Sequence, residues 1–353
     1  MLHFLSRLLL SITLLLVTPL LPAADPTDQA DDLVFNEEPL SHEVALPNWF
    51  KPSFLNLKED LTEAAKAGKK GIILYFGQKY CVYCQALMEV NFRKPDLVAY
   101  TRQHFEVIAI DIWGDREVTD LQGKTLSEKE FALREQTNFT PSLLFYDLQG
   151  REALYLPGYY PPYKFQAALE YVAGEHYSTQ SFRQYLVKGE AGFVDDSGLN
   201  QNNEFEAPPY LLNRSQWSAS RPLVVFFEQG NCHACNVLHT DILQQEEISK
   251  LLQAFERVQL NMWADTPVIT PDGKKLTARQ WADSLNLFYA PTLVFFDETG
   301  KEILRLDSTT YSQRLGLVLQ YIVTKGYQQQ RYFHRWRERY LSDQAESSER
   351  ISY

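Results

Sequence analysis

The chain contains the same unit twice, and this duplication constrains its fold more than any other feature. Trp113 and Trp263 lie in the similar segments Asp-Ile-Trp-Gly-Asp and Asn-Met-Trp-Ala-Asp, 150 positions apart. A Gly-Lys pair and a proline followed by an apolar run recur at the same offset. Two Cys-x-x-Cys pairs begin at Cys81 and Cys232. They are 151 positions apart, one more than the other repeated features. A repeat this long predicts two tandem domains rather than a solenoid of short units.

Each copy alternates apolar strands with helical segments. Continuous apolar runs such as Ile72–Phe76 are typical of strands covered on both faces. In the first copy we expect strands at 72–76, 105–111, 142–147 and 152–156, and helices at 57–67, from 81 through 88, at 125–136 and at 162–172. In the second we expect strands at 223–227, 257–261, 292–297 and 302–305, and helices from 232 and at 277–285. This alternation predicts an α/β protein whose two domains each have a central mixed β-sheet flanked by helices.

The N-terminus has the pattern of a secretory signal peptide. Arg7 precedes the apolar run Leu8–Val17, and the small residues Ala23 and Ala24 suit cleavage before Asp25. The run is short for a membrane-spanning helix, and an uncleaved anchor is the alternative. We therefore expect an exported, periplasmic protein without an integral membrane segment once the signal is removed. The segments that we predict are a signal peptide (1–24), an irregular acidic segment (25–44), domain 1 (45–188), a polar linker (189–217), domain 2 (218–343) and a polar tail (344–353).

The net charge of the chain is −11, which gives no bulk attraction to nucleic acid. One stretch differs: residues 331–340 are rich in arginine and aromatic side chains. We expect a terminal helix that packs its aromatic residues inward, with contact to lipid headgroups or a partner as the alternative.

All four cysteines of the chain belong to the two pairs. A bridge across two residues closes almost no loop and so stabilises a fold little, which indicates redox chemistry rather than stapling. Each pair follows a predicted strand and opens a helix, where unpaired N–H groups favour a thiolate. Cys81 and Cys232 are therefore the predicted attacking residues, and Cys84 and Cys235 the residues that resolve the mixed disulfide with a protein client.

Two other interpretations of the cysteines stay open. His233 and His239 could complete a zinc or copper site with Cys232 and Cys235, although we expect no metal and no other cofactor. The pairs could also be inert bridges in a tandem module that binds clients or a metal without catalysis.

A proline precedes a strand in each copy, in Thr140-Pro141 and Ala290-Pro291. A cis peptide there would leave the preceding backbone free to pair with a client chain, so these four residues are candidate substrate-binding residues. The alternative is an ordinary trans proline at the start of a strand.

The order of strand, Cys-x-x-Cys helix and proline before a strand resembles the thioredoxin superfamily. The motifs that also resemble the SoxW-type periplasmic thioredoxins are Cys81-Val-Tyr-Cys84, Asp111-Ile-Trp-Gly-Asp115, Thr140-Pro141, Phe145-Tyr-Asp147 and Leu156-Pro-Gly-Tyr159. The resemblance covers most of residues 45–188 and of 218–325. It implies two thioredoxin folds, cis peptides at Pro141 and Pro291, and dithiol–disulfide exchange with protein clients.

The chain departs from thioredoxins beside both cysteine pairs. Thioredoxins commonly carry a buried carboxylate six positions before the first cysteine, where this chain has Tyr75 and Phe226. Glu228 is the substitute that we predict in the second domain, with an exposed charge at the strand end as the alternative, and the first domain has Gly77 at the matching place. The tryptophan usual beside the first cysteine is also missing, with Tyr80 and Asn231 in its place.

The residues between the cysteines predict different redox potentials for the two pairs. A protonated His233 would stabilise the Cys232 thiolate, whereas Tyr83 adds no charge to the first pair. Glu228 opposes this effect, and we expect the adjacent histidine to prevail. The second pair is therefore predicted to be the more oxidising one.

Overall fold

In the computed structural model of the chain, residues 37–189, 198–200 and 203–351 are described. The predicted signal peptide, most of the acidic segment, and residues 190–197 and 201–202 of the predicted linker lie outside these residues. The first domain contains, in order, α1 (Leu57–Lys66), β1 (Gly71–Gly77), α2 (Val82–Ala86), a π-helical turn (Leu87–Asn91), α3 (Pro95–His104), β2 (Phe105–Asp111), β3 (Glu117–Thr119), β4 (Thr125–Ser127), α4 (Glu128–Arg134), β5 (Ser142–Asp147), β6 (Glu152–Pro157), α5 (Pro162–Ala173), a 3-10 turn (His176–Ser178) and α6 (Phe182–Gly189).

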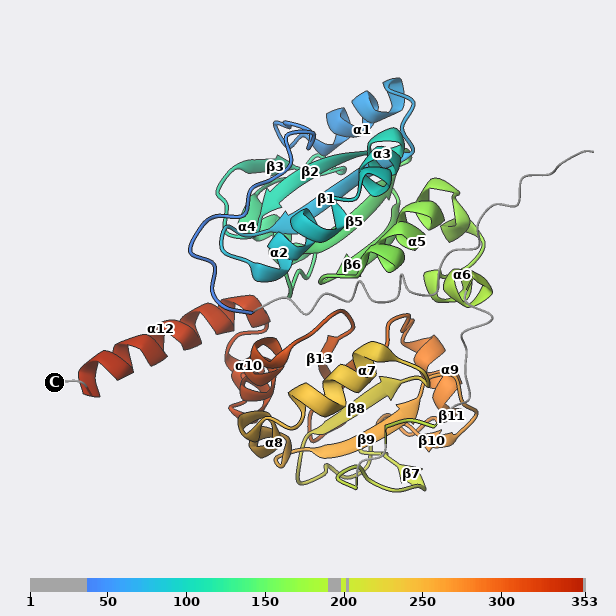
Figure 1. The fold of residues 1–353 in the computed structure, drawn as a ribbon, viewed down its shortest axis with the longest axis vertical. Helices are drawn as coiled ribbons and strands as arrows, with labels where there is room; N and C mark the ends of the chain where they lie inside the picture. Colours follow the sequence, from blue (N-terminus) through green and yellow to red (C-terminus); the bar gives the residue numbers. More distant parts are fainter. Residues whose placement is uncertain (1–36, 190–197, 201–202, 352–353) are drawn as a thin grey trace, which may run out of the picture. The chain divides into compact units, whose positions relative to one another are not determined.

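The sheet of the first domain is mixed, as predicted. Its strand order is β2-β1-β5-β6, with β1 parallel to β2 and antiparallel to β5 (Figure 1). Strand β1 is buried along its whole length, and alternate residues face two different cores. Ile73 and Tyr75 face the core formed with α2, α3 and α5, while Ile72 and Leu74 face the core formed with α1 and α4. The continuous apolar run of this strand is thus explained by helices on both faces.

The second domain repeats this plan. It contains β7 (Tyr210–Leu211), β8 (Leu223–Glu228), α7 (His233–Val237), a π-helical turn (Leu238–Ile242), α8 (Glu246–Leu252), β9 (Glu256–Asn261), β10 (Pro267–Ile269), β11 (Lys275–Thr277), α9 (Ala278–Ser284), β12 (Thr292–Phe296), β13 (Glu302–Leu306), α10 (Ser312–Val323), α11 (Gly326–Gln329) and α12 (Phe333–Ile351). The sheet order β13-β12-β8-β9 matches that of the first domain strand for strand.

The sequence prediction missed several short elements. The helix expected from Thr125 begins three residues later, because Thr125–Ser127 pairs with β3 and Ser127 then caps α4. In the predicted linker, Tyr210 and Leu211 pair with β10. The basic aromatic stretch forms the start of α12, and Phe333 and Trp336 are buried in the core of the second domain, as predicted.

The last helix of each domain, α6 or α12, places an arginine on a tryptophan of the other domain. Arg183 of α6 lies 3.8 Å from the ring centre of Trp263, and Arg335 of α12 lies 3.9 Å from that of Trp113. Arg183 is only 2% exposed and donates to the carbonyl oxygens of Met262 (2.9 Å) and Leu287. The two copies therefore exchange equivalent contacts.

We expect Arg183→Ala to lower the free energy of unfolding by about 2–4 kcal/mol, because the buried carbonyl groups of Met262 and Leu287 lose their donor. Urea and thermal unfolding of the full chain measure this loss. The matched control is Arg102→Ala, which removes an exposed arginine from α3. Equal stabilities of the two variants would contradict the assigned role of Arg183.

Candidate functional site

Each Cys-x-x-Cys pair lies at the junction between a central strand and a helix. Cys81 caps the N-terminus of α2 and Cys232 that of α7, and the two pairs form the disulfides Cys81–Cys84 and Cys232–Cys235. The N–H groups of Cys84 and Cys235 donate to the sulfur of the first cysteine at 3.0 and 3.1 Å. The same N–H would stabilise a thiolate at that sulfur.

The two cysteines of a pair differ in their access to solvent. Cys81 and Cys232 are 5% and 7% exposed, whereas Cys84 and Cys235 have no exposed surface. The first cysteine of each pair is thus the less buried of the two. The division into attacking and resolving cysteines stays a prediction.

The predicted prolines lie beside the first cysteines. The Thr140–Pro141 and Ala290–Pro291 peptides are both cis, as the resemblance implies. The Cys81 sulfur lies 3.3 Å from the Thr140 hydroxyl oxygen, and the Cys232 sulfur lies 3.7 Å from the Ala290 carbonyl oxygen. The structure thus brings all four cysteines and both proline dipeptides together in two equivalent places.

A glutamine and tryptophan pair flanks each cysteine pair and was missed by the sequence analysis. The indole N–H of Trp113 donates to Gln78 at 2.8 Å, and that of Trp263 donates to Gln229 at 2.9 Å. Gln78 in turn donates to the Thr140 hydroxyl at 3.2 Å, which links Trp113 to the Cys81 site. Both glutamines stand three positions before the first cysteine, and this repetition was the signal available in the sequence.

The second domain holds a buried acid beneath α7. Glu228 has no exposed surface, so the alternative of an exposed strand-end charge is wrong. Its two carboxylate oxygens lie 2.9 and 3.1 Å from Nε2 of His239, and Gln259 donates to it at 3.0 Å. His239 follows Cys235 by four residues, one helical turn along the same face. The structure therefore places His239 on Glu228 rather than in a metal site with the cysteines.

The first domain has a phenol where the second has a carboxylate. Gly77 and Met88 occupy the places of Glu228 and His239, and a Cβ added at Gly77 would lie 2.2 Å from the Tyr75 hydroxyl oxygen. The Tyr75 hydroxyl thus fills the space beside the strand end. Burial, with a smaller contribution from Asp111, raises the pKa of Tyr75, so the group stays neutral.

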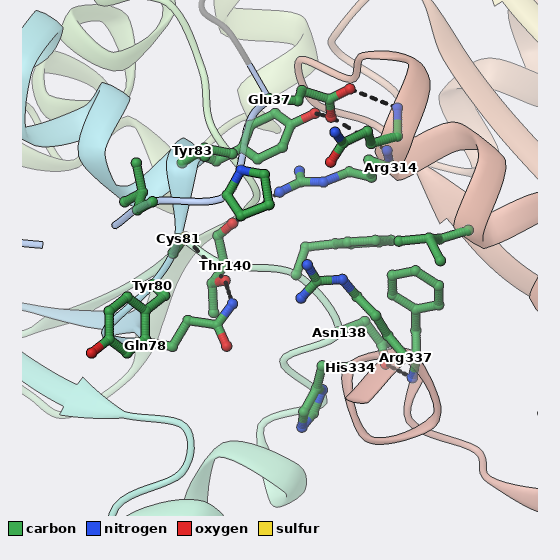
Figure 2. A pocket seen from close by; sticks show the side chains of 17 residues that line it. Glu37, Gln78, Tyr80, Cys81, Tyr83, Asn138, Thr140, Arg314, His334 and Arg337 are labelled. Atoms are coloured by element: carbon green, nitrogen blue, oxygen red, sulfur yellow. Dashed lines mark hydrogen bonds between the residues drawn. The ribbon is translucent and has the colours of Figure 1, made fainter. Parts of the chain in front are cut away.

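Side chains of the second domain line the surroundings of Cys81 (Figure 2). The Arg314 guanidinium lies 3.4 Å from the ring centre of Tyr83 and donates to the Thr140 carbonyl oxygen at 3.0 Å. The Tyr83 hydroxyl donates to Glu37 at 2.7 Å. Tyr83, which the sequence analysis treated as a neutral spacer, is therefore buried between two charged groups, whereas His233 in the second pair is exposed.

No group of three or more potential metal-ligating side chains occurs in residues 37–189, 198–200 and 203–351. Within the same ranges, no helix is long and apolar enough to cross a membrane.

The match to a family model agrees with the duplicated architecture. The family model described as "Thioredoxin-like domain" matches residues 57–173 and 216–322. No curated protein matches the chain. A thioredoxin-fold protein from Helicobacter pylori is 26% identical, with coverage of 35% of this chain and 82% of its own and a TM-score of 0.31. A thioredoxin from Thermus thermophilus is 20% identical, with coverage of 40% and 95% and a TM-score of 0.26. A disulphide isomerase from Xylella fastidiosa Temecula1 is 17% identical, with coverage of 43% and 99% and a TM-score of 0.24.

A double-mutant cycle tests the pairing of Glu228 with His239. We expect His239→Met to lower the free energy of unfolding by about 3–5 kcal/mol, because a buried carboxylate loses its main partner. The double variant Glu228→Leu/His239→Met should lose clearly less than the sum of the two single variants, because both polar groups leave together. Additive losses in urea unfolding would show that the two side chains do not act as a pair.

Proposed function

This chain belongs to the thioredoxin-like domain family, and we propose that it is a thiol-disulfide oxidoreductase that exchanges disulfides with protein clients through both Cys-x-x-Cys pairs. The observation that carries this proposal is the repeated geometry: a cysteine at a helix N-terminus, a more deeply buried partner cysteine, and a cis proline beside them. Structural bridges would not need this arrangement twice.

The exchange proceeds in two steps. In the reducing direction, the Cys81 thiolate attacks a client disulfide, a mixed disulfide forms, and one client thiolate leaves. Cys84 then attacks the mixed disulfide, which releases the second client thiol and forms the Cys81–Cys84 disulfide. Two electrons pass to the client, and an external dithiol must restore the reduced pair. The oxidising direction reverses these steps, and Cys232 and Cys235 act in the same way.

The clients and the compartment are also part of this proposal. We infer that the backbone at Thr140-Pro141 and Ala290-Pro291 holds the client chain next to the first sulfur of each pair. Export is supported by the signal-like residues 1–24 and by the use of cysteine in redox pairs alone. The resemblance to SoxW-type proteins stays a prediction within this family.

The function is tested by insulin reduction with dithiothreitol as the electron donor. We expect the wild-type chain to accelerate the reaction and the Cys81→Ser/Cys232→Ser double variant to fall to the uncatalysed rate, because no attacking thiolate remains. Each single variant should keep part of the activity. A wild-type rate equal to the blank would instead favour a non-catalytic binding module.

Trapping identifies the clients of each domain. In Cys84→Ser and Cys235→Ser variants the resolving thiol is missing, so the mixed disulfide with a client should persist. Mass spectrometry of the trapped complexes then shows which proteins each domain meets, and whether they are captured from exported material.

We expect His233→Ala to make the second pair less oxidising by some tens of millivolts, on the scale where 1.4 kcal/mol corresponds to about 30 mV. A protonated imidazole next to Cys232 would stabilise the reduced, thiolate form, so its loss lowers the potential. The measurement is a glutathione titration of the full chain with Cys81 and Cys84 replaced by serine. The control is the first pair, titrated with and without His233→Ala in a chain whose Cys232 and Cys235 are replaced by serine. An unchanged second potential would contradict the effect.

A further inference from the structure

A pocket of about 140 Å³ lies directly beside the first cysteine pair. Cys81, Thr140 and Gln78 line one side of it, and Arg337 and His334 from α12 line the other (Figure 2). Arg314 from the start of α10 adds a second guanidinium. The pocket thus concentrates positive charge next to a reactive sulfur, in a chain whose net charge is −11.

Several polar groups of this pocket have no partner. Nη1 of Arg314 and both ring nitrogens of His334 are buried without a hydrogen bond. Burial lowers the pKa of His334 to about 4, so at neutral pH the ring is uncharged and carries one N–H donor. Burial also lowers the pKa of Arg314 and of Arg337, as expected for guanidinium groups whose charge is poorly solvated. Buried donors left unpaired cost free energy that a suitable acceptor would recover.

The chain's own acidic segment shows which chemistry this pocket accepts. The Glu37 carboxylate receives hydrogen bonds from the Tyr83 hydroxyl at 2.7 Å and from the Gln313 N–H at 2.6 Å. Glu37 therefore sits at the N-terminus of α10, on the edge of the pocket, where the helix dipole also favours an anion. It leaves Nη1 of Arg314 and the ring nitrogens of His334 unpaired.

We propose that this pocket binds a carboxylate side chain of the client, close to the client cysteine that reacts with Cys81, so that the first domain selects acidic client segments. The proposal rests on the exchange activity proposed above. A volume of this size holds a few waters or one side chain. An arginine pair recognises a carboxylate through charge-assisted hydrogen bonds, and such contacts give specificity as well as affinity. The second domain has a different environment, with Asn231 and His233 exposed beside Cys232.

The test measures a single disulfide exchange at Cys81 in the full chain, with Cys84, Cys232 and Cys235 replaced by serine. The probes are blocked peptides Gly-Xaa-Cys-Xaa-Gly whose cysteine carries a 2-thiopyridyl disulfide, with glutamate or glutamine as Xaa. The Cys81 thiolate attacks the peptide sulfur, a mixed disulfide forms, and pyridine-2-thione leaves and is followed by its absorbance. We expect the glutamate peptide to react about fivefold to tenfold faster than the glutamine peptide.

Three variants separate a carboxylate subsite from general electrostatics. Arg337→Gln should bring the glutamate-to-glutamine rate ratio close to one. Arg339→Gln makes the same charge change at an exposed position of the same helix and should leave the ratio intact. Glu37→Gln removes the internal carboxylate and should raise the ratio. Unfolding curves of all variants confirm that they are folded.

Three outcomes would overturn the proposal. The first is a ratio near one in the parent chain. The second is an Arg337→Gln chain whose reaction rates with the two peptides fall by the same factor, because the arginine would then only stabilise the Cys81 thiolate. The third is an equal preference for glutamate when Cys232 is the single remaining cysteine. A chain that reacts with neither peptide would contradict the exchange activity itself, and the subsite with it.

Discussion

The register between two central strands of each sheet fixes the chemistry of this protein. Phe76 on β1 pairs with Ser142 on β5, and Phe227 on β8 pairs with Thr292 on β12. In each sheet the loop that leads to the cysteine pair therefore meets the strand that begins after the cis proline. A shift of one residue would turn the buried side chains of β1 to the opposite face and separate the sulfur from the proline. The first cysteine of each pair, the resolving cysteine and the client-binding backbone all depend on this pairing.

The two copies share this register but differ in the charged side chains that lie near the first cysteine of each pair. The second domain buries a carboxylate and surrounds it with His239 and Gln259, which offsets part of the cost of desolvation. The first domain fills the same region with the neutral Tyr75 hydroxyl and has its charges above the site, on Arg314 and Arg337. One duplicated frame thus surrounds its two cysteine pairs with different charged groups.

Most strands and helices, and the positions of the cysteine and proline motifs, could be predicted from the sequence. These features are local patterns, and each pattern occurs in both copies of the repeat. The choice between a buried and an exposed Glu228 could not be made from the sequence, because its partner Gln259 is 31 positions away and both interpretations of a strand end look alike in sequence. Short hairpins such as β3 and β4 have too few residues for a periodic signal. The place of Arg314 beside the first cysteine pair could not be predicted either, because its contact with Thr140 spans 174 positions and joins two domains.

The exchanged arginines link the two domains through side-chain contacts in both directions. Arg183 belongs to the last helix of the first domain, yet its guanidinium is buried against Met262 and Trp263 of the second. Arg335 makes the equivalent contact with Trp113 in the opposite direction. Trp113 in turn donates to the glutamine that reaches the Cys81 site, so the second domain contacts the first site through this chain of side chains as well as through Arg314. A rearrangement at the boundary of the two domains would therefore change the charge and the hydrogen bonds beside Cys81 while leaving the strand register, and hence the cysteine geometry, intact.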